Sequence, residues 1–183
     1  MLTDSNFLFC LLIVNAVLNA YARSPRADKA LKAAGLLREM EEHNKRNCRP
    51  DIISYNTLLL ACSNAFGNKE LRQRSYIIAV EAFKAAMVGA HDVQPTSTTF
   101  SNFLRASRRL VDPVKRPSLL RKTFKLCCKL GLVNKAVMSQ IKQACLNDEE
   151  WGEVVESAAQ FIHRDDRIQI SRLPQSWTCH ARR

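Results

Sequence analysis

The sequence predicts an all-α fold, an α-solenoid of stacked antiparallel helix hairpins. Three observations carry this prediction. Pro50 and Asp51 end one segment and cap the next, in which apolar residues follow at helical spacing. A similar stretch recurs along the chain at intervals of roughly 40 residues, as in helical repeat proteins. Few β-branched runs alternate with period two, and no strand-turn-strand signal is present, so β-structure is not expected.

Four anchor positions mark the repeat. Each anchor is a short polar residue in an apolar helix, and an alanine follows it in the next turns, which suits a helix whose neighbour approaches closely. The anchors are Asn15, Asn56, Ser101 and Ser139, and the alanines are Ala20, Ala61, Ala106 and Ala144. The array is therefore expected over about residues 1–163, with repeats at about 11–51, 52–96, 97–134 and 135–163. A basic, partly ordered tail is expected at 164–183.

Residues 1–22 admit two interpretations. The apolar run from Phe7 to Val14, followed by Ala-Tyr-Ala at 20–22, resembles a secretory signal with its cleavage site. Asp4 and the lack of a basic residue before Phe7 favour the first helix of the array instead. The stretch is too short and too interrupted by Asn15 to span a membrane. An Arg- and Ser-rich, acid-poor leader is not recognised.

Local signals predict the bounds of the other helices. Ser24 as N-cap with Pro25 in the first turn predicts a second helix over about 26–47. The third helix is expected to end near Phe66, and a loop is expected over 112–117. Asn147 with Glu150 resembles a capping box for a last helix over about 149–163.

Composition restricts the partners. The chain has 28 Lys and Arg against 17 Asp and Glu, a net charge of +11. This excess favours a polyanionic partner, nucleic acid first and an anionic membrane surface second. A basic surface that is merely solvated is the alternative. The seven cysteines are an odd number without Cys-x-x-Cys spacing, so a zinc site is not expected, no cofactor is predicted, and a reducing compartment is the default.

The sequence does not indicate an enzyme. A zinc deaminase requires His-x-Glu with a later Cys-x-x-Cys, and neither motif occurs. The acidic clusters at 148–150 and 165–166 are explained by helix capping or solvation. No nucleophile with its base and no phosphate-binding loop is recognised.

The stretch Pro-Asp-Ile-Ile-Ser-Tyr-Asn-Thr-Leu-Leu at 50–59 resembles the pentatricopeptide repeat (PPR) family. The resemblance is clearest over residues 11–134 and weaker to about 163. The long units and Asn-Ala-Val-Leu-Asn-Ala-Tyr-Ala at 15–22 resemble arrays of algae and other protists. Tetratricopeptide repeats are the nearest rival, but their Trp-x-x-Leu-Gly pattern is missing. The family implies binding of single-stranded RNA, one base per repeat, in RNA processing, stability or translation in a mitochondrion or plastid.

The resemblance also assigns site residues. Base-reading pairs would be Asn15 with Asp51, Asn56 with Thr96, and Ser101 with Asn134. In the family the first combination favours uracil and the third adenine, whereas the second is not a common pairing and receives no base. Residues between bases would be Leu12, Ile53 and Thr98, and phosphate contacts would come from Arg23, Arg105 and Arg109, with Arg108, Lys115, Arg116 and Lys122 nearby.

Each assignment has a plainer alternative. Asp51 and Thr96 suit helix N-caps whatever else they do, Asn15 and Asn56 suit solvated positions, and Leu12 and Ile53 suit the core. At the level of the whole protein, the alternative to RNA is an acidic peptide bound on the same face by a protein-interaction scaffold. An array of three or four repeats is short, which suggests a fragment, a homo-oligomer or a protein that works beside other RNA-binding proteins.

Overall fold

A computed structural model describes residues 4–42, 49–156 and 169–181, with side chains from residue 11 onward. Within these ranges every regular element is a helix, so the predicted all-α helical repeat is confirmed. The chain divides into two compact units, Met1–Pro95 and Thr96–Arg183. Each unit holds two helix hairpins and is described by itself.

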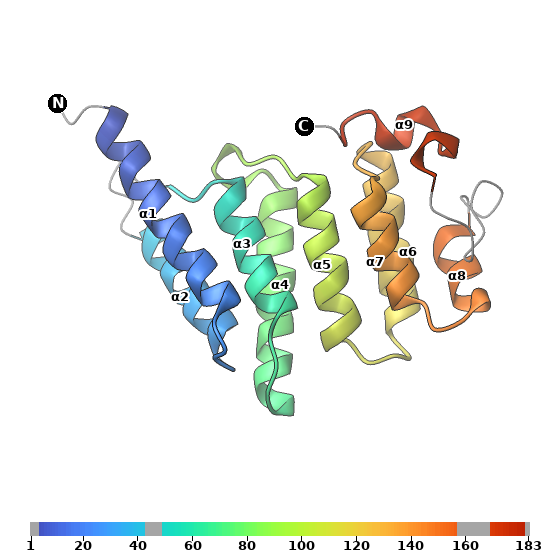
Figure 1. Ribbon diagram of the computed structural model, residues 1–183, viewed down its shortest axis with the longest axis horizontal. Helices are drawn as coiled ribbons and strands as arrows, with labels where there is room; N and C mark the ends of the chain where they lie inside the picture. Colours follow the sequence, from blue (N-terminus) through green and yellow to red (C-terminus); the bar gives the residue numbers. More distant parts are fainter. Residues whose placement is uncertain (1–3, 43–48, 157–168, 182–183) are drawn as a thin grey trace. The chain divides into compact units, whose positions relative to one another are not determined.

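Unit 1 contains the first two hairpins. Its elements are α1 (Asp4–Arg23), α2 (Lys29–Glu42), α3 (Ile52–Ser63), α4 (Lys69–Met87) and the short 3₁₀ turn η1 (Ala90–Asp92). The first helices of the hairpins, α1 and α3, pack together, and α2 packs against α3 and α4 (Figure 1). The Nδ2 of Asn64, the residue after α3, donates to the Ala22 carbonyl of α1 at 3.1 Å. The hairpins therefore stack in register, first helix on first helix.

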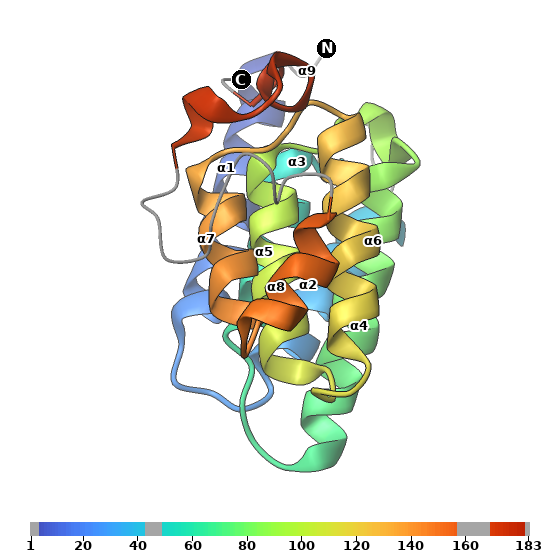
Figure 2. The same ribbon diagram turned by 90° about the vertical axis from the view of Figure 1, so that its right-hand side faces the viewer.

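Unit 2 repeats the arrangement. Its elements are α5 (Ser97–Leu110), α6 (Arg116–Lys129), α7 (Lys135–Ala144), α8 (Asp148–Val155), the 3₁₀ turn η3 (Ile170–Arg172) and α9 (Gln175–Thr178). Again the first helices α5 and α7 pack together, and α6 packs against α8 (Figure 2). Phe100, Leu104, Phe124 and Ile141 are buried in its core.

Three of the four repeat alanines lie in helix contacts. Ala61 and Ala106 are fully buried and Ala144 is 1 % exposed. Ala20, the equivalent alanine of α1, is exposed. The first hairpin thus presents to solvent a position that the other hairpins bury.

The structure corrects the predicted start of the second helix and supports the first-helix interpretation of residues 1–22. The second helix begins at Lys29, not near Arg26, because Ser24 closes α1 instead of opening α2: its hydroxyl donates to the Tyr21 carbonyl at 2.8 Å. The predicted end of that helix falls at 43–48, outside the described residues. Helix α1 packs against α3, as the first-helix interpretation of residues 1–22 requires.

Further bounds differ at the loops. Helix α3 ends at Ser63, before Phe66, and α6 starts at Arg116, within the expected loop. Helix α8 begins at Asp148, capped by Asn147 as predicted; its expected end near 163 lies outside the described residues. None of the described helices is long and apolar enough to cross a membrane.

The described part of the C-terminal segment, residues 169–181, packs on α6. The Val133 amide donates to the Trp177 carbonyl at 2.8 Å, and the His180 amide donates to the Gly131 carbonyl at 2.9 Å. The Trp177 ring meets Phe124 edge-on with ring centroids 6.0 Å apart. This segment therefore covers one end of the α6 helix.

Candidate functional site

Asn15, Asp51 and Ser54 form one hydrogen-bonded cluster at the stacking of α1 on α3. Asp51 is the N-cap of α3: its Oδ1 accepts from the Ser54 amide at 2.8 Å, and the Asp51 amide donates to Ser54 Oγ at 3.2 Å. The Asn15 Nδ2 donates to the same Oδ1 at 3.2 Å. Ser54 Oγ lies 2.7 Å from Asn15 Oδ1 and 2.9 Å from Asp51 Oδ1, so its single proton is donated to one of them at a time.

This cluster leaves polar atoms for a ligand. Asn15 and Asp51 are both partly exposed. Among the described residues, the hydrogen bonds to the Asp51 side chain all involve Oδ1. The cluster therefore presents one carboxylate oxygen as an acceptor, beside the second amide proton of Asn15 as a donor.

Two apolar side chains flank the cluster at equivalent positions of α1 and α3. Leu12 is 57 % exposed and Ile53 is 56 % exposed, so neither belongs to the core. Thr98, the equivalent residue of α5, is also exposed but small and polar. The structure thus excludes the core alternative for Leu12 and Ile53.

Asn56 and Thr96 belong to different units, so each is placed within its own. Asn56 lies in the first turns of α3 and is partly exposed. Thr96 is the N-cap of α5, in a capping box with Thr99 in which the Thr96 amide donates to Thr99 Oγ1 at 2.9 Å. The expected capping role of Thr96 is confirmed.

Ser101 and Asn134 lie in unit 2, in α5 and at the start of α7. Both are partly exposed. Asn134 is the N-cap of α7, and its Oδ1 accepts from the Val137 amide at 3.0 Å. Each second member of a predicted pair is therefore a helix N-cap, which fixes its side chain at the mouth of the following hairpin. The fourth anchor, Ser139, accepts a hydrogen bond from Gln143 Nε2 at 3.1 Å.

Arginines gather at the end of α5. Arg105 and Arg109 were predicted to contact phosphate; Arg109 is exposed and Arg105 partly so. Burial lowers the pKa of Arg108, and repulsion from Arg105, Arg109 and Arg116 lowers it further. The Nε atoms of Arg108 and Arg116 are buried and, in the part of the chain that the structure describes, donate to no hydrogen-bond acceptor. The four guanidinium groups repel one another, and a bound anion would reduce this repulsion.

Arg23 occupies the corresponding end of α1. Its Nε donates to Asn19 Oδ1 at 3.0 Å, and both side chains are exposed. Because the Arg23 side chain is exposed, a phosphate oxygen could accept from its Nη groups.

The described cysteines are structural in character. Cys62, Cys127, Cys128 and Cys145 are buried free thiols, and Cys179 is exposed. Burial raises the pKa of Cys62 and Cys127 and raises that of Cys128 to about 12, so these thiols stay protonated at neutral pH. Among the described residues no three His, Cys, Asp or Glu side chains gather as a metal site would require.

Sequence reasoning missed Ser54 as a member of the cluster. Its signal is local: a serine three places after an N-cap aspartate completes a capping box. That Ser54 also joins Asn15 depends on the stacking of α1 on α3, which no local pattern specifies.

Comparison with known proteins gives one match. The family model of the pentatricopeptide repeat domain matches residues 35–108. No curated protein and no solved structure matches the chain. The matched range contains α3, α4 and the 50–59 stretch that carries the resemblance, which is thereby confirmed. Over residues 35–108 the chain is similar to the pentatricopeptide repeat domain.

Proposed function

We propose that the chain binds single-stranded RNA through the first helices of its hairpins, in organellar RNA processing, stability or translation. The family is one of helical repeat proteins that bind RNA, and the net charge of +11 suits a polyanion. A mitochondrion or plastid is the proposed location, on the family alone. Other RNA-binding proteins are proposed to act beside so short an array.

The observation that carries the proposal is the Asn15–Asp51 pair. A free uracil edge offers an N–H donor between two carbonyl acceptors. The Asp51 carboxylate can only accept and the Asn15 amide can donate, so together they complement that edge. Exposed Leu12 and Ile53 on either side supply apolar surface against the base faces.

The proposed base contacts are less complete in the other repeats. Ser101 with Asn134 is proposed to read adenine, and Asn56 with Thr96 contributes without an assigned base. Thr98 offers little apolar surface, so the third repeat is expected to bind its base more weakly than the first. Arg23, Arg105 and Arg109 are proposed to contact the phosphates.

Fluorescence anisotropy tests the proposal with short labelled RNAs, matched single-stranded DNA and duplex RNA at two salt concentrations. We expect preference for single-stranded RNA with U and A two places apart. Asn15→Ala should weaken binding to this RNA by about tenfold, since a good bidentate base contact contributes about 1–3 kcal/mol of discrimination. Gln73→Ala, an exposed polar residue on α4, is the matched control and should have no effect.

Asp51→Asn provides a sharper variant. Asparagine keeps the N-cap but presents a donor as well as an acceptor, so preference for uracil should fall while the fold is retained. Equal binding to all three polyanions, insensitive to Asn15→Ala and Asp51→Asn, would contradict base reading. In that case an acidic peptide becomes the better candidate ligand.

A further inference from the structure

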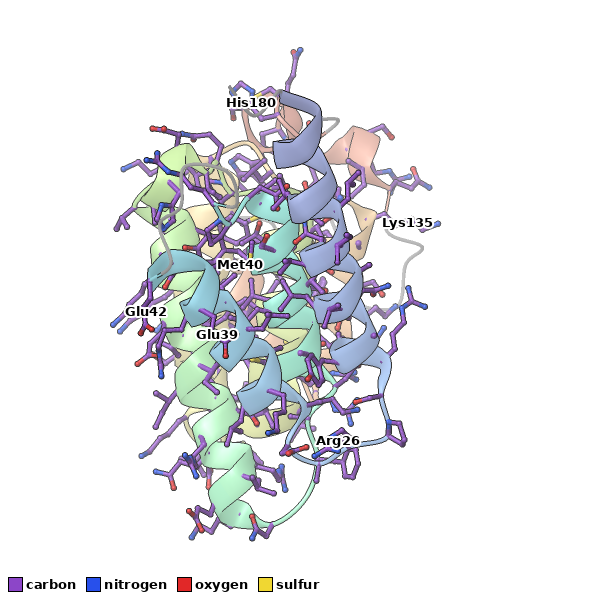
Figure 3. All side chains as sticks on the ribbon, turned by 90° about the vertical axis from the view of Figure 1, so that its left-hand side faces the viewer. Arg26, Glu39, Met40, Glu42, Lys135 and His180 are labelled. Atoms are coloured by element: carbon purple, nitrogen blue, oxygen red, sulfur yellow. The ribbon has the colours of Figure 1, made fainter. Side chains whose placement is uncertain are left out.

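The outer face of the first hairpin has the composition of a buried repeat interface. Anchored on Asn15 and Asn56, Val17 and Tyr21 of α1 are the equivalents of Leu58 and Cys62 of α3. Leu58 is 3 % exposed and Cys62 fully buried, because α1 and α2 cover them. Val17 is 41 % exposed and Tyr21 is partly exposed. The first hairpin therefore shows to solvent the surface that the second hairpin buries against a neighbour (Figure 3).

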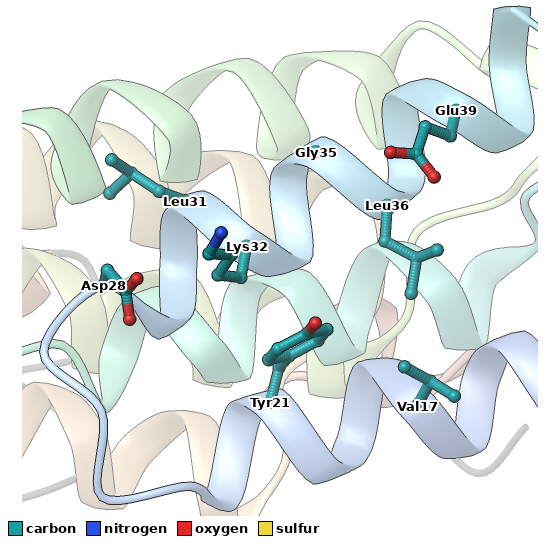
Figure 4. A pocket seen from close by; sticks show the side chains of 8 residues that line it. All are labelled: Val17, Tyr21, Asp28, Leu31, Lys32, Gly35, Leu36 and Glu39. Carbon is teal, nitrogen blue, oxygen red and sulfur yellow. The ribbon is translucent and has the colours of Figure 1, made fainter.

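This surface is a groove between α1 and α2. Its open volume is about 550 Å³, and its walls are Val17 and Tyr21 from α1, Asp28 just before α2, and Leu31, Lys32, Gly35, Leu36 and Glu39 from α2 (Figure 4). A smaller pocket of about 170 Å³ lies at the equivalent place between α3 and α4; it is lined by Leu58, Ile78 and Ala82 and also by Ala34 and Leu37 of α2, which packs against both helices. In unit 1 the groove between α3 and α4 is therefore covered by a helix of the neighbouring hairpin, whereas the groove between α1 and α2 is open.

No contact within the first hairpin accounts for a glycine at position 35. Glycine within a helix costs about 1 kcal/mol relative to alanine. A Cβ at Gly35 would meet no atom within 4 Å, so packing inside the described structure does not require glycine. A bare backbone at the centre of an open groove lets another helix approach closely.

The two charges nearest Gly35 in the groove, Lys32 and Glu39, are opposite in sign, while Asp28 at the end of the groove is paired with Arg26. Lys32, Gly35 and Glu39 lie on one face of α2, one turn apart. Lys32 stands before the glycine and Glu39 after it, so an antiparallel copy of α2 crossing at Gly35 brings each lysine opposite a glutamate. Leu31 and Leu36 flank the stripe and add apolar surface to such a contact.

We propose that this face binds the same face of a second copy of the chain, with α2 packed antiparallel to α2 about a two-fold axis near Gly35. Lys32 of one copy pairs with Glu39 of the other, twice, and Val17 and Tyr21 close the apolar part. An isologous contact of this kind buries the open groove of both copies at once. The inference does not depend on RNA binding.

Sedimentation velocity of the full chain without RNA, from low to high micromolar concentration, tests it. We expect a concentration-dependent dimer that Lys32→Glu weakens by about tenfold or more, because two attractive pairs become repulsive. Glu39→Lys should do the same. An equimolar mixture of the two variants should dimerise again, since each glutamate then meets a lysine. Lys122→Glu, an exposed charge on α6 in unit 2, is the control and should leave the dimer unchanged.

Gly35→Leu is the second, independent variant. It should abolish the dimer while the thermal midpoint of the monomer stays the same or rises, because leucine favours the helix and its Cβ has open space. A chain that is monomeric at every concentration overturns the proposal. The proposal is also overturned if the dimer persists in Gly35→Leu, or if mixing Lys32→Glu with Glu39→Lys does not restore the dimer. Either result would assign the groove to a different helical partner.

Discussion

Asn15 and Asp51 lie 36 positions apart in the sequence, yet their side chains are joined by a hydrogen bond of 3.2 Å. The stacking of α1 on α3 brings them together, and the cap of α3 holds Asp51 in place. One carboxylate thus serves both as a helix cap and as a member of the proposed base-reading pair. The structural and functional interpretations of Asp51 are both compatible with this geometry.

Stability measurements can separate the two roles. Asp51→Ala should lower the free energy of unfolding by about 0.5–2 kcal/mol, because the Ser54 amide at the start of α3 loses its acceptor. Asp51→Asn should cost little, since asparagine caps nearly as well. Urea denaturation followed by circular dichroism measures both. If Asp51→Asn destabilised as much as Asp51→Ala, the carboxylate charge rather than the cap would be holding the cluster.

Much of the fold could be predicted because its signals are local. The Pro50-Asp51 pair lies directly before a helix, and the apolar residues and the repeated alanine each lie within one helix. These signals locate α3, α5 and α7 closely. Ser24-Pro25 was misleading because the same pair that can open a helix can also close one. The Ser24 hydroxyl donates to the carbonyl of Tyr21, three residues earlier, and the sequence alone does not specify this turn.

The positions of the candidate site residues could be predicted from the sequence, but the hydrogen bonds between them could not. Asn15 and Asp51 follow from the repeat register, whereas the shared contacts of Ser54 with both depend on how two hairpins stack. The packing of residues 169–181 on α6 joins Gly131 to His180, far along the chain, and carries no periodic signal.

Salt dependence tests the arginines. For single-stranded nucleic acid the slope of log K against log salt is about −0.7 per phosphate contact. Arg109→Gln should therefore reduce the magnitude of the slope by about 0.7, and adding Arg105→Gln should reduce it again by a similar amount. Anisotropy titrations at several salt concentrations give these slopes. Arg74→Gln on α4, an exposed arginine, is the control. Slopes that stay at the wild-type value would remove Arg105 and Arg109 from the phosphate contacts.

Two glycines of unit 2 should respond oppositely to alanine. Gly131 has a φ of 67°, and a Cβ there would lie 2.6 Å from Cys179 Sγ and 3.1 Å from the Ser176 carbonyl. Gly131→Ala should destabilise unit 2 by about 1 kcal/mol or more and displace residues 169–181 from α6. Limited proteolysis should then cleave the chain faster on the C-terminal side of Gly131. Gly152 lies in α8 with no atom within 4 Å of its Cβ position, so Gly152→Ala should stabilise by about 0.5–1 kcal/mol. Equal effects of the two changes would mean that residues 169–181 do not pack on Gly131.

The buried thiols predict a loss of stability at alkaline pH. Burial raises the pKa of Cys62, Cys127 and Cys128 above the ordinary value of 9.0, so the folded chain keeps protons that the unfolded chain releases. A raised folded pKa gives stability that is complete below pH 9 and is lost as the pH rises above it, by at most about 1.4 kcal/mol per thiol per pH unit. Urea denaturation under reducing conditions at neutral pH and at about pH 10 measures this loss. Cys62→Ala, which lowers stability at both pH values by leaving a cavity, should nevertheless narrow the difference between them. Cys179→Ala removes an exposed thiol and should leave the difference unchanged. A pH dependence that Cys62→Ala does not alter would show that Cys62 is accessible to hydroxide in the folded chain, contrary to its burial between the first two hairpins.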